Sequence, residues 1–284
     1  MDVELRHLRA FVEVARQQSF TRAAEKLTIT QPALTRTVQQ LETTLRVRLF
    51  NRSSRYVELT NVGNSFLAQV ERVLNELDRA VSALSEQVSI RLGFSWLMPD
   101  PWAQRTVSEF ERASGSTVNI VRTDDPVQAL QRHAIDVALV RGSVCPSVPV
   151  KVVHLFDEPR VAVACAAGSD VSRLDEVDWA DVPRWPLVVN VVSGATGQWS
   201  WAPGEGPRDV VETTNYDEWV ESVAANRGIG VAPTVGVRRI NHPGVAFVPL
   251  VNAPPVPVGL AYLPHMQELL LRRFIDVAIA AVDR

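Results

Sequence analysis

Hydrophobic residues in the first 45 positions recur three and four residues apart, the spacing of one face of an α-helix. This pattern predicts a first helix over residues 4–17. Ser19 is expected to cap a second helix over residues 20–27, and Thr30 to cap a third that begins at residue 31. Pro32 lies in the first turn of that third helix, where an N–H would lack a partner anyway, so it indicates a helix start.

Two β-prone runs then flank NRSSR (51–55) and predict a small hairpin, or wing. After the wing, Thr60 or Asn61 can cap a long helix whose apolar residues follow the alternating steps of a coiled coil. We call these residues the heptad stripe: Leu67, Val70, Leu74, Leu77, Val81, Leu84 and Val88. A helix packed on its own domain is the alternative. A stripe this long and narrow favours a partner helix, so its residues are predicted to form a dimerisation surface.

From residue 89 onward, short apolar runs alternate with amphipathic stretches. Strands are predicted at 90–94, 118–121, 136–140, 150–156, 160–165, 186–190, 229–233, 245–250 and 258–263. Helices are predicted at 100–114, 126–132, 216–226 and 265–283, the first two beginning at Asp-Pro pairs. This alternation predicts α/β units with mostly parallel sheets.

The charge is divided unevenly along the 284-residue chain, whose total is −3. Residues 1–60 hold ten Lys and Arg against six Asp and Glu, a balance of +4. Residues 90–284 hold seventeen against twenty-two, a balance of −5. The front of the chain alone is therefore expected to meet a polyanion.

The second and third predicted helices, joined by a three-residue turn, form a helix-turn-helix candidate for DNA binding. Arg, Gln, Thr and Ala at the start of the third helix can reach base edges, and cations of the wing can reach phosphate or the minor groove. The predicted DNA-binding residues are Ser19, Thr21, Thr30, Gln31, Pro32, Ala33, Thr35, Arg36, Arg52 and Arg55. A three-helix module for protein contacts is the alternative.

The segments SFTRAAEKLTITQPALTRTVQQLETTLRVRLFNR and VELTNVG closely resemble the winged helix-turn-helix signature of LysR-type transcriptional regulators, over about residues 4–65. Two departures are Asn61-Val62, where the family more often has an acidic residue or alanine, and a wing without its usual glycine. The resemblance implies an α+β multidomain protein. On this resemblance we expect a winged helix-turn-helix at 1–60, a linker helix for dimerisation at 61–89 and an effector-binding domain at 90–284.

The resemblance also implies an effector domain like the periplasmic solute-binding proteins, with ligand between two α/β subdomains. Subdomain I is expected at 90–160 and 264–284, subdomain II at 161–263, and the crossings at RVAVAC and LAYLP. It further implies a dimer through antiparallel linker helices, a tetramer through the effector domains, and an interrupted palindrome of double-stranded DNA as target. RNA polymerase is a further candidate partner.

In such folds ligands lie beyond the carboxyl ends of strands and face helix N-termini, which favours carboxylates. The residues at the predicted strand ends give these effector-binding candidates: Ser95, Trp96, Thr123, Asp124, Arg141, Ser193, Gly194, Thr196 and Asn215. Helix capping by Ser95 and Thr123, a surface position for Arg141 and a core position for Trp96 are the alternatives. If several of Trp96, Trp102, Trp199 and Trp201 line the cleft, a bulky or aromatic effector is favoured.

Other classes of function find less support in the residues. The five histidines lack metal-ligand spacing, and GxSxG, P-loop and GxGxxG motifs are absent, so neither an enzyme nor a cofactor or metal site is predicted. A solute-binding protein would need a signal peptide, and the chain shows neither that nor an apolar run long enough to span a membrane. A cytoplasmic, nucleoid-associated bacterial regulator is expected. Redox sensing by Cys145 and Cys165 is the alternative, although burial in an apolar strand would make Cys165 inert.

Overall fold

The computed structural model describes residues 3–52, 57–82, 89–142, 149–264 and 269–282. Contacts divide the chain into two compact units, one made of residues 1–86 and 132–134 and the other of residues 87–131 and 135–284. The described part contains no helix long and apolar enough to cross a membrane.

The first unit is a three-helix cluster with a two-stranded hairpin and a long helix. Its elements are α1 (Leu5–Gln17), α2 (Phe20–Lys26), α3 (Gln31–Leu45), β1 (Phe50–Arg52), β2 (Val57–Leu59) and α4 (Asn61–Ser82). Ser19 caps α2, since its Oγ accepts a hydrogen bond from the amide of Arg22 at 3.3 Å. Thr30 occupies the N-cap position of α3 but makes no side-chain capping bond. β1 and β2 pair antiparallel, which confirms the predicted wing; its tip, residues 53–56, lies outside the described residues.

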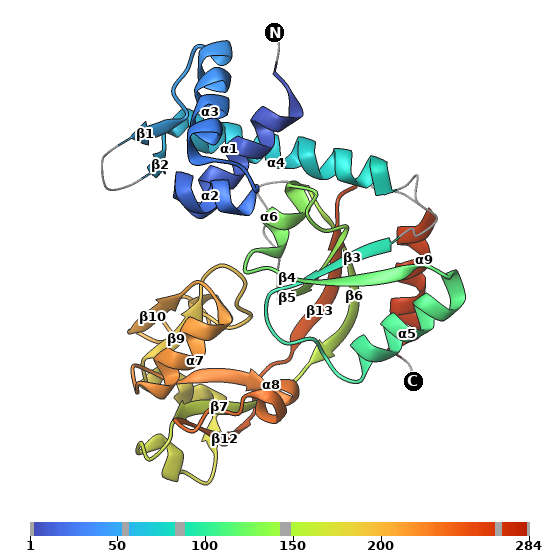
Figure 1. Cartoon of the computed structure of the whole chain (residues 1–284). Coiled ribbons are helices and arrows are strands. Elements are labelled where there is room, and N and C mark those ends of the chain that lie inside the picture. The colour runs from blue at the N-terminus through green and yellow to red at the C-terminus, as the bar shows by residue number, and fades with distance from the viewer. Residues whose placement is uncertain (1–2, 53–56, 83–88, 143–148, 265–268, 283–284) are drawn as a thin grey trace. The chain divides into compact units, whose positions relative to one another are not determined.

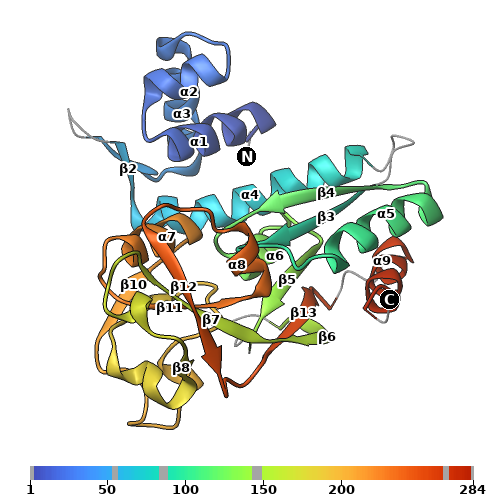
Figure 2. The ribbon, with the colours of Figure 1, turned by 90° about the horizontal axis from the view of Figure 1, so that it is seen from below.

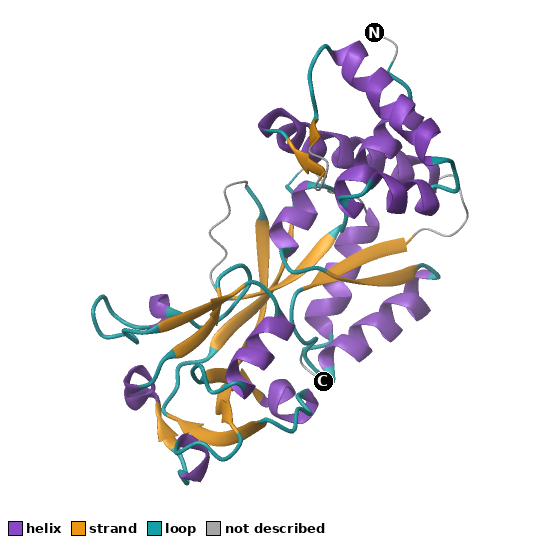
Figure 3. Ribbon diagram, turned by 60° about the vertical axis from the view of Figure 1, so that its left-hand side comes forward, coloured by secondary structure: helices purple, strands orange, loops and turns teal. Residues whose placement is uncertain are grey.

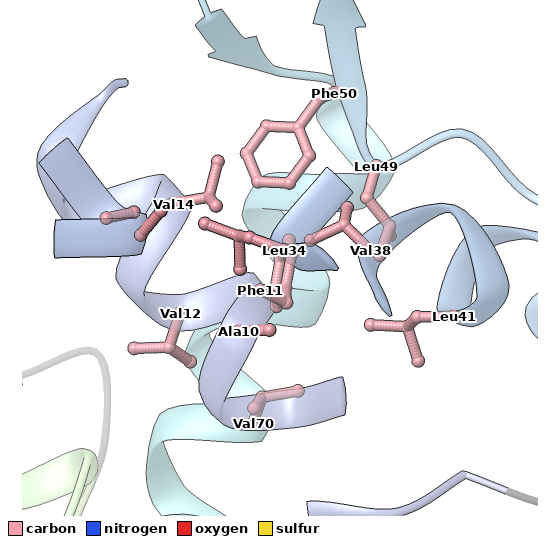
Figure 4. Close-up of a cluster of buried hydrophobic side chains, with 12 residues drawn as sticks. Ala10, Phe11, Val12, Val14, Leu34, Val38, Leu41, Leu49, Phe50 and Val70 are labelled. Carbon is pink, nitrogen blue, oxygen red and sulfur yellow. The ribbon is translucent and has the colours of Figure 1, made fainter. Parts of the chain in front are cut away.

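The core of the first unit, shown in Figure 4, unites the three short helices with the wing. Phe11 of α1 and Leu34, Val38 and Leu41 of α3 are fully buried. Phe50 of β1 packs on Phe11 with ring centroids 5.4 Å apart. The apolar spacing read from the sequence therefore corresponds to the faces that meet in this core.

The heptad stripe of α4 divides between two environments. Thr60 caps the helix, as its Oγ1 accepts from the amide of Gly63 at 2.9 Å. Val70 is buried in the core of the first unit, and Leu67 and Leu74 pack against that core. Leu77 is half-buried and Val81 is 56% exposed, while Leu84 and Val88 lie outside the described residues. At its first three positions the stripe therefore packs on its own domain, the alternative considered from the sequence, and dimerisation through the stripe stays a prediction.

Subdomain I of the second unit is a five-stranded sheet in the order β4-β3-β5-β13-β6 (Figure 1). Its strands are β3 (Ser89–Phe94), β4 (Thr117–Arg122), β5 (Val137–Arg141), β6 (Lys151–Glu158) and β13 (Val256–Tyr262). Its helices are α5 (Trp102–Ser114), α6 (Pro126–Gln131) and α9 (Leu269–Ala280). Helices α5 and α9 lie side by side in Figure 1 and Figure 2, joined by Phe110 and Phe274 with ring centroids 5.2 Å apart.

Subdomain II is built on a four-stranded sheet in the order β11-β7-β12-β8 and a parallel pair β9-β10. Its strands are β7 (Arg160–Ala166), β8 (Val177–Asp178), β9 (Leu187–Asn190), β10 (Val210–Thr213), β11 (Gly230–Pro233) and β12 (Val245–Val251). Its helices are α7 (Tyr216–Ala224), α8 (Thr234–Arg239) and the short 3₁₀ turns η1 (Val171–Arg173), η2 (Trp179–Arg184) and η3 (Gln198–Ser200). Figure 3 shows the strands of both subdomains in orange, with the purple helices along their flanks.

The two subdomains are joined where one strand follows another across the sheets. The chain passes from β6 to β7 through Pro159, and from β12 to β13 through residues 252–255. Because β13 pairs with β5 and β6, it belongs to subdomain I, and the predicted limit of subdomain II at 263 is corrected to about 255. The crossings likewise precede RVAVAC and LAYLP.

The expectation of mostly parallel sheets also differs from the structure. The pairs that involve β7 with β11 and β12, and β13 with β5 and β6, are antiparallel, so the sheets are mixed rather than mostly parallel. β7 and β13 are the strands that follow the two crossings, and each runs antiparallel to its neighbours in the sheet that it joins. A pattern of apolar runs does not show the direction of a strand. The short elements β8, β10 and α8 were not predicted from the sequence.

Candidate functional site

The exposed face of α3 carries the predicted base-reading residues. Gln31, Pro32, Ala33 and Arg36 are exposed, whereas Leu34 between them is fully buried. Gln31 donates from Nε2 to Thr35 Oγ1 at 3.1 Å, which links the two side chains along the helix. The start of α3 therefore presents donors, acceptors and one cation on a single rigid face, as recognition helices require.

The remaining predicted DNA contacts lie around that face. Thr21 and Thr30 are exposed and Ser19 is half-buried at the start of α2. The side chain of Arg52 and the whole of Arg55 lie outside the described residues. These residues keep their role as predictions.

A cavity lies between the two subdomains of the second unit, with about 760 Å³ of empty space including its open mouth. Six of the nine predicted effector-binding residues line it: Ser95, Trp96, Arg141, Ser193, Gly194 and Thr196. Its wall also includes Glu158, Pro159, Arg160, Asn190, Tyr216 and Trp219.

Three predicted effector-binding residues are not among those that line the cavity. Thr123 donates to the carbonyl of Asp125 at 3.3 Å, and Asp124 is exposed beside Arg122 at 3.5 Å. Asn215 caps α7, since its Oδ1 accepts from the amide of Glu218 at 2.9 Å. Thr123 and Asn215 bond to the local backbone and Asp124 pairs with a neighbouring side chain, so proximity to a strand end did not by itself bring them to the site.

Arg141 and Glu158 form a bidentate ion pair at the cavity wall. Arg141 donates from Nε to Glu158 Oε2 at 2.7 Å and from Nη2 to Oε1 at 3.2 Å. The side chains are 8% and 10% exposed, which excludes the alternative of a surface cation for Arg141. Arg141 also donates to the carbonyl of Leu97 and lies 5.5 Å from the ring centroid of Trp96. The pair is thus fixed in position and its charges cancel.

Arg160, the first residue of β7, was not predicted and lies at the same cavity. It donates from Nε to Thr196 Oγ1 at 2.9 Å, from Nη2 to the carbonyl of Ala195 at 2.9 Å, and from Nη1 to the carbonyls of Pro254 and Pro255. Burial lowers the pKa of this guanidinium to about 10. Its sequence signal was a charged residue at the head of the apolar run RVAVAC.

Three aromatic side chains form one side of the cavity. Trp96 of subdomain I meets Tyr216 and Trp219 of α7, with ring centroids 6.1 and 6.3 Å apart. Gly236 of α8 makes room for Trp96, because a Cβ there would come within 2.8 Å of Cη2 of the indole. Burial raises the pKa of the Tyr216 hydroxyl, so it stays a neutral donor at neutral pH.

The other tryptophans considered from the sequence lie elsewhere. Trp102 is buried and donates from Nε1 to the carbonyl of Ala278 at 2.8 Å. Trp199 is 61% exposed. Trp201 stacks on Trp179 with ring centroids 4.3 Å apart, and the guanidinium of Arg160 lies 5.1 Å from the Trp179 centroid. Of the four tryptophans considered from the sequence, Trp96 alone lines the cavity.

The described residues offer little for metal or thiol chemistry. Among them no group of three His, Cys, Asp or Glu side chains could hold a metal ion. Cys165 is 1% exposed, and burial raises the pKa of its thiol. Since the thiolate is the reactive form, this environment disfavours oxidation at Cys165. Cys145 lies outside the described residues.

Comparison with known proteins agrees with both units. Residues 5–64 match the bacterial regulatory helix-turn-helix protein, lysR family, and residues 85–283 match the LysR substrate binding domain. The chain is 30% identical to the HTH-type transcriptional regulator IlvR of Caulobacter vibrioides over 94% of this chain and 96% of that one. It is 28% identical to the Hca operon transcriptional activator HcaR of Escherichia coli over 97% of both chains.

Among solved structures, that of CbnR, a LysR family transcriptional regulator, covers 99% of both chains with a TM-score of 0.71 and 21% identity. That likeness supports the fold. The two family matches together span nearly the whole chain, and the curated relatives named above are transcriptional regulators. This chain therefore belongs to the LysR family and is a DNA-binding transcription regulator with an effector-binding domain.

Proposed function

We propose that this regulator reads an interrupted palindrome of double-stranded DNA through α3, and that a small molecule bound between the two subdomains controls its effect on transcription. The exposed start of α3, with Gln31 and Arg36 on a face opposite buried Leu34, supports the first part. Two such helices in a dimer would meet two half-sites, so we expect the target to be palindromic.

The effector role is carried by one observation: a single cavity is lined by polar and aromatic residues from both subdomains. Ser95 and Trp96 come from subdomain I, and Ser193, Thr196 and Tyr216 come from subdomain II. A ligand that touches both subdomains stabilises the arrangement that brings them together, because it binds that arrangement more tightly than an open one. A change in the effector domain then alters the placement of the DNA-binding units and the bend of the DNA.

The proposal includes assembly through α4 and action in the bacterial cytoplasm, at the nucleoid. Leu77 and Val81 continue the heptad stripe beyond the residues that pack on the core of the first unit. We assign these two positions to a partner helix. A tetramer through the effector domains and contact with RNA polymerase complete the proposal.

The test combines ligand binding with DNA binding in the full chain. A library of small metabolites is screened for compounds that raise the unfolding temperature, and each hit is added to a footprinting assay on DNA selected by the protein itself. We expect at least one stabilising compound to change the length or position of the footprint. Hits that leave the footprint unchanged would remove the regulatory role from the cavity.

A further inference from the structure

We propose that the cavity selects an effector with one carboxylate and an apolar ring, that Arg160 holds the carboxylate, and that the Arg141–Glu158 pair excludes a second one. This inference rests on the proposed effector role of the cavity. Its basis is the balance of charge around the cavity together with the separation of its polar and aromatic walls.

The charged side chains among the described residues that line the cavity are Arg141, Glu158 and Arg160. Arg141 and Glu158 are bound to each other through two hydrogen bonds of 2.7 and 3.2 Å, so their charges cancel at short range. Arg160 has neutral partners instead: a hydroxyl of Thr196 and backbone carbonyls. Among the described residues, no carboxylate lies within salt-bridge distance of Arg160. The cavity therefore carries one uncompensated positive charge.

That uncompensated charge is unfavourable without an anion. Burial removes the Arg160 guanidinium from water, which is why its pKa falls to about 10. Thr196 and backbone carbonyls accept from four of its five N–H groups, so a carboxylate would bind through the second hydrogen of Nη2 and through the attraction of opposite charges. Ser193 and Thr196 are close together in the sequence and both line the cavity, so their hydroxyls can donate to the same anion.

A second carboxylate meets a different environment. The cation available to it is Arg141, but Glu158 already occupies the Nε and Nη2 groups of that guanidinium. An incoming anion would have to break the pair and lie beside the buried Glu158 carboxylate, which repels it. The rest of the ligand faces Trp96, Tyr216 and Trp219, whose rings favour an apolar, preferably planar, body.

The experiment compares matched probes on the full chain by thermal shift and isothermal calorimetry. Benzoate, phenylacetate and 3-phenylpropionate vary the distance from ring to carboxylate. Their amides remove the charge, their para-carboxylated counterparts add a second one, and acetate removes the ring. We expect at least one of the three aryl monocarboxylates to bind at least about tenfold more tightly than its amide, its dicarboxylate and acetate.

Two variants locate the charges. Arg160→Met should abolish the preference for the monocarboxylate over its amide, whereas Arg173→Met, at an exposed position outside the cavity wall, should leave it unchanged. Glu158→Gln frees the charge of Arg141 and should improve binding of the dicarboxylate about tenfold. Glu176→Gln, an exposed acid elsewhere in subdomain II, should not.

The outcomes separate the two proposals. Binding of an amide or a dicarboxylate as tight as that of the monocarboxylate overturns the charge selection but keeps the cavity as an effector site. A Glu158→Gln variant that folds normally and gains no affinity for dicarboxylates overturns the role of the ion pair. If no probe binds while another compound from the metabolite library does, the ligand class is wrong and the effector role stands; if nothing binds, both fall.

Discussion

Trp96 of subdomain I lies edge-on against Trp219 of subdomain II, with ring centroids 6.3 Å apart and planes at 80°. Trp219 is itself fixed by a hydrogen bond from Nε1 to the carbonyl of Val188 at 3.0 Å. Trp96 is thus a side chain of one subdomain packed into the hydrophobic cluster of the other. The pair joins the two halves of the effector domain at the edge of the cavity.

Removal of that contact should weaken the effector domain. We expect Trp96→Ala to lower the free energy of unfolding by roughly 2 kcal/mol, about half the cost of deleting a fully buried tryptophan, because Trp96 is half-buried. The measurement is thermal and denaturant unfolding of the full chain. Trp199→Ala, at a 61% exposed position, is the control and should change stability little. Equal stability of the two variants would mean that the ring adds no packing across the subdomains.

The Arg141–Glu158 pair makes a separate prediction about stability. Arg141→Met leaves a buried carboxylate without a partner and should cost about 3–5 kcal/mol. The double variant Arg141→Met, Glu158→Met removes both charges and should cost clearly less than the single one. On the surface, loss of the Arg184–Asp181 pair through Arg184→Met should cost no more than about 1 kcal/mol. Chemical denaturation of the unaltered chain, Arg141→Met, Glu158→Met and the double variant gives the coupling energy of the pair, and additive costs would contradict a tightly coupled pair.

For the DNA-binding unit, we predict that Arg36→Ala weakens binding to selected operator DNA by about 1–3 kcal/mol, or roughly 5- to 150-fold. Arg36 is exposed on the reading face of α3, so the fold should persist. Gel-shift titration at fixed salt measures the loss, and Arg9→Ala on the exposed side of α1 is the matched control. An unaltered footprint and affinity would exclude Arg36 from base recognition.

The outer part of the heptad stripe should govern assembly. Leu77→Asp places a charge at an apolar position and is expected to shift the sedimentation profile toward smaller species. Arg72→Asp, exposed on the same helix and outside the stripe, should leave the profile as it is. Circular dichroism checks that both variants retain their helices. Sedimentation identical to the unaltered chain would mean that Leu77 packs within its own subunit.

A last prediction concerns Cys165, whose thiol pKa is raised chiefly by burial. A raised pKa keeps the thiol protonated at pH values where an exposed cysteine already forms thiolate. Between pH 7 and 9 the native protein should therefore alkylate at Cys165 much more slowly than the denatured protein, as peptide mass spectrometry can show. Rapid native modification of Cys165 would revive the redox alternative.

Several features were determined by the sequence alone, because they depend on residues close together in the chain. Helical spacing, the N-cap Ser19 and the start signal Pro32 predicted the helices of the first unit. The apolar runs predicted the longer strands of the second. Six effector-site candidates line the cavity because they follow strand ends, which meet at one edge of such sheets.

The tertiary structure decided what depends on residues far apart in the chain. It placed Arg160 against Thr196 and the carbonyls of residues 254 and 255, and it joined Arg141 to Glu158, which no local pattern specifies. It also decided which residues of the heptad stripe pack on the core of their own unit. The sequence could not decide this, because the spacing of apolar residues is the same whether their own domain or a partner helix covers them. Spacing determines which face of an element is apolar; packing between distant segments determines what that face meets and which charges remain unpaired.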